Sequence, residues 1–139
     1  MKLGLEGKRA LVVGASKGLG AAIAVTLANE GAQVIGAARS TDAIAALNDQ
    51  LESGAQGRIS PARLDLADPG SVTQLIASLE AGGGVDIVVN NSGGPPPGEA
   101  RSTEPATFEE QFAVMVSPLI AISQAMLRGM VERKWGRIV

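Results

Sequence analysis

The stretch that decides the fold is ALVVGASKGLGAAIA, residues 10–24, in which a short apolar run leads into three glycines and then into residues that favour helix. We expect Gly14 to let the chain turn sharply out of a strand, Gly18 to let backbone approach a ligand, and Gly20 to let the helix pack closely on a sheet. The free N–H groups and positive dipole end of such a helix attract anions. The stretch therefore predicts a strand, a tight turn and a helix N-terminus that binds pyrophosphate.

Apolar strands and amphipathic helices alternate along the whole chain. We expect strands at 9–13, 34–38, 59–64, 85–89 and from 136, and helices at 18–30, 41–51, from 69 and at 107–133. Leu19, Ile23 and Leu27 share one face of the first helix. Pro61 suggests an outer strand, and Asp68 is expected to cap the third helix. The alternation predicts an α/β fold, a doubly wound parallel sheet of the Rossmann type. We expect one domain over residues 1–139, incomplete at its C-terminal end because the fifth strand has only begun.

The last predicted helix carries a long apolar pattern. Thr107 and Glu110 fit a capping box at its start, and Pro118 is expected to kink it because proline lacks the N–H that the helix needs. Its apolar side chains recur at three- and four-residue steps: Phe108, Phe112, Met115, Leu119, Ile122, Met126 and Met130. Packing within the subunit explains much of this pattern, and contact with a second subunit is the alternative.

Four of the predicted loops follow the carboxyl ends of parallel strands, where ligands bind in open α/β sheets. These loops hold the glycine run, Arg39, Asp65 and residues 90–93, and we expect them to gather along one rim. The predicted cofactor-binding residues are Gly14, Ser16, Lys17, Gly18, Leu19, Gly20, Arg39, Asp65, Leu66, Asn90, Asn91 and Gly93.

Composition argues against several other kinds of site. The chain has a net charge of −2 with its basic residues dispersed, which argues against a nucleic-acid partner. It has no cysteine and no histidine, so we expect no metal site. We see no signal peptide in residues 1–8 and no apolar run of membrane-spanning length, and therefore expect a cytoplasmic protein without a membrane partner.

Taken together, these motifs resemble those of the short-chain dehydrogenase/reductases, and most closely the 3-oxoacyl-[acyl-carrier-protein] reductase group. The spacing of Gly14, Gly18 and Gly20 matches that family's Gly-x-x-x-Gly-x-Gly motif, and residues 90–93, Asn-Asn-Ser-Gly, correspond to its Asn-Asn-Ala-Gly. Residues 64–66 match its short acidic motif, whose Asp contacts the adenine amino group, and residues 135–139 match the entry to its fifth strand. The resemblance implies hydride transfer between a nicotinamide cofactor and a small carbonyl or alcohol substrate, in a homodimer or homotetramer.

The choice of cofactor can be predicted from charge. Enzymes that select NAD usually have a carboxylate at the end of the second strand, whereas NADP requires cations there. This chain has Ala38 followed by Arg39, and a second cation, Lys17, in the glycine loop. We therefore expect NADP, with NAD the less favoured cofactor. The alternative is that both cations are ordinary solvated surface charges.

No catalytic residue can be assigned within the chain. The resemblance implies a Ser after the fifth strand and a Tyr and a Lys four residues apart on the next helix, but the chain has no tyrosine. We expect these three positions to lie beyond Val139 and the 139 residues alone to be inactive. Met115 stands where the family commonly has a water-binding Asn, although it also fits an ordinary core methionine. A catalytically silent dinucleotide-binding or assembly module is therefore the alternative function.

Overall fold

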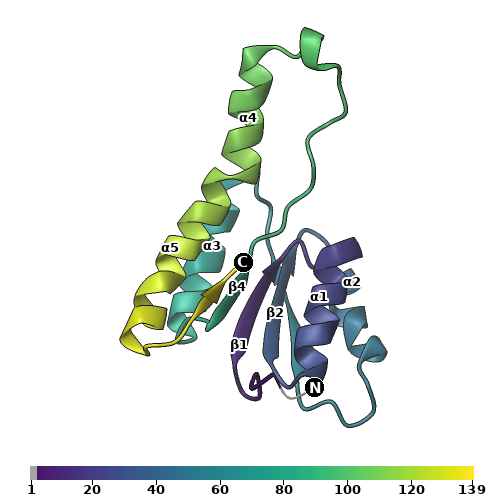
Figure 1. Cartoon of the computed structure of the whole chain (residues 1–139), viewed down its shortest axis with the longest axis vertical. Helices are drawn as coiled ribbons and strands as arrows, with labels where there is room; N and C mark the ends of the chain where they lie inside the picture. The colour runs from purple at the N-terminus through teal and green to yellow at the C-terminus, as the bar shows by residue number, and fades with distance from the viewer. Residues whose placement is uncertain (1–2) are drawn as a thin grey trace.

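The structure is a computed structural model that describes residues 3–139, so the first two residues of the N-terminal segment, where we expect no signal peptide, lie outside it. Five parallel strands form one sheet in the order β3-β2-β1-β4-β5 (Figure 1). The strands are β1 (Arg9–Val13), β2 (Gln33–Ala38), β3 (Arg58–Arg63), β4 (Ile87–Val89) and β5 (Arg137–Ile138). Because the strand order runs outward from β1 in both directions, the sheet is doubly wound, which confirms the predicted fold class.

Helices cover both faces of this sheet, and each face has its own apolar core. On one face, Ala10 and Val12 of β1 pack with α1 (Gly18–Asn29), α2 (Thr41–Ala45) and the 3₁₀ helix η1 (Ala46–Gln50). On the other face, Leu11 and Val13 pack with α3 (Pro69–Ala81) and α5 (Ser117–Glu132). Successive residues of β1 thus serve opposite cores, because side chains alternate along a strand.

The buried face of α1 differs from the predicted one. Its buried residues are Gly20, Ala24 and Ala28, whereas Leu19 is 69% exposed. Ile23 and Leu27 pack only partly buried at the margin of the core. The small residues of α1 face the sheet because they allow the helix backbone to come close to it.

The predicted start of α3 and the predicted edge strand are both confirmed. Asp68 caps α3, its Oδ1 accepting a hydrogen bond of 2.9 Å from Gly70 N, and Pro69 is the first helical residue. β3, which contains Pro61, is an edge strand of the sheet. Proline is tolerated there because an edge strand has fewer N–H groups to pair.

The helix predicted at 41–51 is wrong in its second half, which winds as the 3₁₀ helix η1. The side chain of Asn48 accounts for the difference. Its Nδ2 donates to Ile59 O at 2.8 Å, and its Oδ1 accepts from Ile59 N at 3.0 Å. Bonds from a side-chain amide to a neighbouring backbone compete with regular helix, and here they also occupy polar groups of the edge strand.

The single kinked helix predicted at 107–133 is two helices, α4 (Pro105–Met115) and α5, which are separated at Val116. Pro118 lies in the first turn of α5, where its missing N–H costs nothing. The predicted capping box at Thr107 is also wrong: α4 begins two residues earlier, with Glu104 as N-cap and Pro105 as first residue. A short 3₁₀ turn, η2 (Ala100–Ser102), precedes α4.

The apolar pattern of this region divides between two environments. Ile122, Met126 and Met130 of α5 are buried against the sheet, whereas Phe108 and Phe112 of α4 are 65% and 55% exposed. Contrary to expectation, the stretch Pro105–Glu132 is apolar and long enough to cross a membrane by length and composition, with a mean hydropathy of 1.5 over its best window. Only 22% of that window is buried in the structure, so packing of α5 against the sheet accounts for only part of its apolar character.

Candidate functional site

The loops predicted to form one rim do line a common cleft, here called the rim cleft. It has a volume of about 790 Å³ and lies at the carboxyl ends of β1, β2, β3 and β4. Ten of the predicted residues line it: Gly14, Ser16, Lys17, Gly18, Leu19, Arg39, Asp65, Leu66, Asn91 and Gly93. The cleft is located where β1 and β4 diverge toward opposite connections, which is the usual ligand position in this architecture.

The glycine loop forms one wall of the rim cleft and requires glycine at specific positions. Gly14 has φ +69°, and a Cβ there would lie 2.5 Å from Asn91 Nδ2 and 2.9 Å from Asn91 O. Gly18 has φ +57°, and a Cβ there would meet nothing within 4 Å, so its backbone is open to the cleft. A positive φ and a close approach therefore select glycine at Gly14, and a positive φ selects it at Gly18.

The N-terminus of α1 presents unpaired backbone donors next to this loop. Lys17 is the N-cap residue and makes no side-chain capping bond, and the first loop-to-helix bond runs from Ala21 N to Lys17 O at 3.3 Å. The N–H groups of the first turn have no partner inside the helix. Together with the helix dipole they make this end suitable for a phosphate group.

Asn91 connects the end of β4 to the glycine loop. Its Nδ2 donates to Val13 O at 3.2 Å and to Gly14 O at 3.4 Å. These bonds hold the segment after β4 against the segment after β1. Asn91 therefore helps to shape the rim cleft as well as lining it.

The acidic motif after β3 is held by its own hydrogen bonds. Asp65 N donates to Ser71 Oγ at 2.9 Å, and Asp65 Oδ1 accepts from Ala67 N at 3.1 Å. Asp65 and Leu66 both line the cleft. This segment offers one polar acceptor and one apolar surface, which suits a heterocyclic base.

Lys17 and Arg39 provide the positive charge of the cleft. Both residues line it and both are exposed. Within residues 3–139, neither forms an ion pair with a carboxylate. Ser16 and Ser40, which are adjacent in sequence to Lys17 and Arg39, also line the cleft and carry hydroxyl groups.

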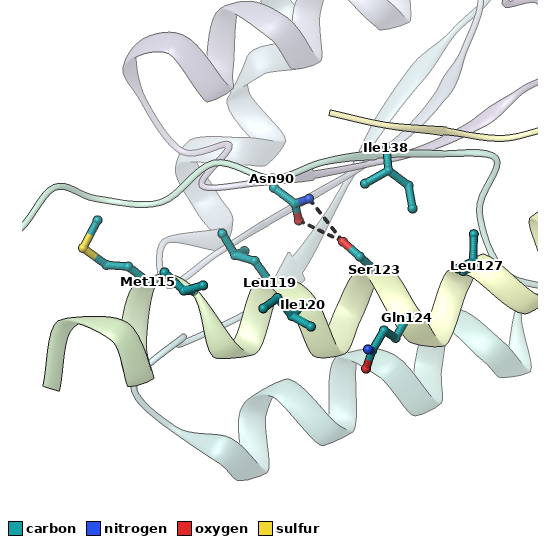
Figure 2. A pocket seen from close by; sticks show the side chains of 9 residues that line it. Asn90, Met115, Leu119, Ile120, Ser123, Gln124, Leu127 and Ile138 are labelled. Atoms are coloured by element: carbon teal, nitrogen blue, oxygen red, sulfur yellow. Dashed lines mark hydrogen bonds between the residues drawn. The ribbon is translucent and has the colours of Figure 1, made fainter. Parts of the chain in front are cut away.

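Two predicted residues lie outside the cleft lining. Gly20 is buried beneath the glycine loop, where a Cβ would collide with the carbonyl oxygen of Gly14. Asn90 faces a second hollow, here called the α5 hollow, of about 360 Å³ (Figure 2). Asn90 Nδ2 donates to Ser123 Oγ at 3.1 Å, and Ser123 Oγ donates to Asn90 Oδ1 at 3.3 Å. In this structure Asn90 thus joins β4 to α5.

The sequence interpretation missed the contribution of α4 to the rim cleft. Gln111, Val114 and Met115 line it from the C-terminal end of that helix. Met115 also lines the α5 hollow and is therefore not a fully buried core methionine. The available signal was spacing, since Gln111 and Met115 are four residues apart and share a helix face.

The rim cleft has a volume and a set of lining residues that suit a phosphate-bearing ligand. Its volume is in the range of small-molecule sites, and it combines a helix N-terminus, a glycine loop, two cations and an acidic motif. No group of three or more potential metal-ligating side chains gathers within the part of the chain that the structure describes. The residues present therefore fit a phosphate-bearing organic ligand.

Comparison with known proteins identifies relatives that belong to one enzyme family. A family model described as short chain dehydrogenase matches residues 8–139. The chain is 36% identical over 138 residues to the 3-oxoacyl-[acyl-carrier-protein] reductase of Escherichia coli, covering 99% of this chain and 55% of that protein. The chain thus spans about half the length of the curated relatives it matches.

Solved structures agree with this assignment. A 3-oxoacyl-[acyl-carrier-protein] reductase from Agrobacterium tumefaciens with NADP bound is 36% identical, with a TM-score of 0.84 over 96% of this chain and 52% of that one. L-Sorbose reductase from Gluconobacter frateurii, complexed with NADPH and L-sorbose, is 29% identical, with a TM-score of 0.85 over 99% and 53%. With its glycine loop, its Asn-Asn-Ser-Gly segment and a family match over nearly its whole length, the chain belongs to the short-chain dehydrogenase/reductase family.

Proposed function

We propose that the protein is an NADP-dependent oxidoreductase and that this chain is its cofactor-binding part. The observation that carries the proposal is the rim cleft, where the α1 N-terminus, two cations and the acidic motif line one volume. The bound cofactor would supply or accept the hydride exchanged with a carbonyl or alcohol carbon.

Each segment of the cleft has a distinct task in this proposal. The first turn of α1 and the exposed backbone at Gly18 would hold the pyrophosphate. Asp65 and Leu66 would hold the adenine, one as a hydrogen-bond acceptor and the other as an apolar surface. Asn91 and Gly93 would border the nicotinamide, because they follow β4 beside the glycine loop.

The preference for NADP rests on charge at the end of β2. Ala38 and Arg39 provide no carboxylate for a ribose 2′-hydroxyl, whereas Arg39 and Lys17 can attract a 2′-phosphate. Two relatives of known structure were solved with NADP or NADPH. We expect NADPH to bind at least about tenfold more tightly than NADH, a difference of about 1.4 kcal/mol.

The cofactor preference is tested by fluorescence titration of the full-length protein with NADPH and NADH. Lys17→Ala and Arg39→Ala should each weaken binding of NADPH and leave binding of NADH nearly unchanged. Arg101→Ala is the control, since Arg101 is an exposed cation outside the cleft lining. A tenfold preference for NADH in the unmodified protein would contradict the proposal.

We further propose that the 139 residues alone do not catalyse the reaction. They contain no tyrosine, so they lack the phenol that serves as acid and base in the family. The test measures NADPH-dependent reduction of small carbonyl substrates by this chain and by the full-length protein. Turnover by the 139 residues at the rate of the full-length protein would refute the proposal.

Met115 supports the second candidate, a catalytically silent dinucleotide-binding or assembly module. It lines the rim cleft where the family commonly has a water-binding Asn, and a thioether is a poor hydrogen-bond partner. A full-length protein that binds NADPH but reduces no carbonyl substrate, and gains activity with Met115→Asn, would favour this second candidate.

The setting that we propose is a cytoplasmic homodimer or homotetramer that binds neither nucleic acid nor membrane. One stripe of exposed apolar residues runs along α4 and α5 at mostly four-residue steps, and it suits a second copy of the chain: Phe108, Phe112, Val116, Ile120, Leu127 and Val131. We refer to it below as the α4–α5 stripe. Light scattering of the full-length protein tests the assembly, and a monomer at all concentrations would exclude it.

A further inference from the structure

The end of β2 that carries Arg39 is held by the neighbouring edge strand. Arg63, the last residue of β3, pairs in register with Ala38. Leu64 N donates to Ala38 O at 3.0 Å, and Arg63 Nη1 donates to Arg39 O at 3.3 Å. Ala38, the last residue of β2, and Arg39, which follows it, thus both accept hydrogen bonds through their carbonyl groups from the end of β3 and the residue after it.

Arg63 adds a third cation to this corner of the molecule. Lys17, Arg39 and Arg63 belong to three different segments, and all three are exposed. The ion pairs found among residues 3–139 involve other arginines. Asp42, three residues after Arg39, and Asp65, two residues after Arg63, form no ion pair with them among the described residues. Like charges on adjacent segments repel one another, and a bound anion relieves that repulsion.

Arg63 could instead serve only to protect the sheet edge, because charged residues commonly prevent edge strands from pairing with other chains. Arg58, at the opposite end of β3, suits that explanation, since it is exposed and makes no side-chain hydrogen bond within the described residues. Arg63 differs in that its guanidinium turns back onto the end of β2. It also lies at the cofactor end of the sheet, two residues before Asp65.

We propose that Arg63 is a positioning residue for recognition of the 2′-phosphate of NADP. It does not line the rim cleft and acts through Arg39, whose carbonyl it holds, while its charge raises the positive potential at that corner. A guanidinium has five N–H donors in a planar fork, so one bond to a carbonyl leaves its charge uncompensated. This inference rests on the proposed NADP preference of the protein.

The experiment compares dissociation constants for NADPH and NADH, measured by fluorescence titration of the full-length protein. Arg63→Ala should weaken NADPH binding by about tenfold, the scale of a hydrogen bond to a charged group, and change NADH binding by less than about twofold. Arg63→Lys, which keeps a charge and a donor, should recover most of the loss. Arg58→Ala removes the same charge from the same strand and should alter neither constant.

The outcomes separate this inference from the proposal on which it rests. If Arg63→Ala leaves NADPH binding unchanged while Arg39→Ala weakens it, the inference is wrong and the NADP preference stands. If Arg63→Ala weakens NADPH and NADH equally, the residue has a general structural role and the inference is again wrong. If the unmodified protein binds both cofactors equally, the NADP preference fails and the inference falls with it. Should Arg63→Ala not fold, Arg63→Gln gives the same comparison with a smaller change in side-chain volume.

Discussion

Helices α1 and α4 both contribute to the rim cleft, but they are built in opposite ways. α1 buries Gly20, Ala24 and Ala28 against the sheet and carries few large side chains. α4 buries no residue at all, although it contains Phe108 and Phe112. In Figure 1, α1 lies along the sheet, whereas α4 extends past the end of it.

The difference shows that position relative to the sheet, and not side-chain size, decides what is buried. Small residues become core residues in α1 because β1 and β2 lie directly beneath them. Large apolar residues stay exposed in α4 because no element of the described chain lies opposite them. The apolar residues that α1 buries are thus packed within the chain, whereas the α4–α5 stripe is exposed, and it is there that we propose contact with a second subunit.

Two neighbouring residues of α5 give the sharpest test of this contrast. Met126 is 2% exposed and Leu127 is 46% exposed. Met126→Ala should lower the free energy of unfolding by about 3 kcal/mol, because it removes buried apolar volume and leaves a cavity. Leu127→Ala should lower the free energy of unfolding of the monomer by less than about 1 kcal/mol.

Chemical denaturation at a protein concentration where the molecule is monomeric measures both changes. Equal losses for the two variants would show that α5 does not have one buried face and one exposed face, and the contrast with α1 would then fail.

The sequence predicted the sheet and most of the rim cleft because those parts depend on local patterns. The strand alternation, the Asp68 cap and the edge position of Pro61 each follow from short-range rules, and the structure confirms all three. The glycine spacing indicated a helix N-terminus at a strand end, and the loop residues do gather there. Parallel strands bring their carboxyl ends to one edge, so the convergence of four loops could be predicted without coordinates.

The features that could not be predicted depend on contacts between distant segments. The 3₁₀ winding of η1 arises from Asn48 binding Ile59, and the placement of Asn90 from its pairing with Ser123 on α5. The exposure of Leu19 and the burial of Gly20 depend on how closely α1 approaches the sheet. The spacing of apolar residues in a sequence indicates which face of a helix is buried, but it does not indicate how closely the helix approaches the element on which it packs.

The close approach of α1 can be tested at Gly20. A methyl group there would collide with the carbonyl oxygen of Gly14, which is backbone and cannot move away easily. Gly20→Ala should therefore destabilise the protein by about 2 kcal/mol despite the better helix propensity of alanine. Gly94→Ala is the matched control, since a Cβ at Gly94 would meet nothing within 4 Å.

Thermal unfolding of both variants measures the difference, and binding of NADPH provides a second readout for Gly20→Ala. If Gly20→Ala is as stable as the unmodified protein, α1 does not need a glycine at this contact and the contrast between α1 and α4 becomes weaker.

The smallest effect on monomer stability is expected in α4. Phe112 is 55% exposed, so Phe112→Ser should change the free energy of unfolding of the monomer by no more than about 0.5 kcal/mol. The same change should raise the dissociation constant of the proposed dimer by at least about tenfold, because aromatic residues near the centre of an interface contribute most to binding. Glu110→Ala is the control, since residues two apart lie on nearly opposite sides of a helix.

Light scattering over a dilution series measures assembly, and denaturation of the diluted protein measures stability. A large loss of monomer stability with unchanged assembly would mean that Phe112 packs within its own subunit, and the contrast with α1 would then have to be abandoned.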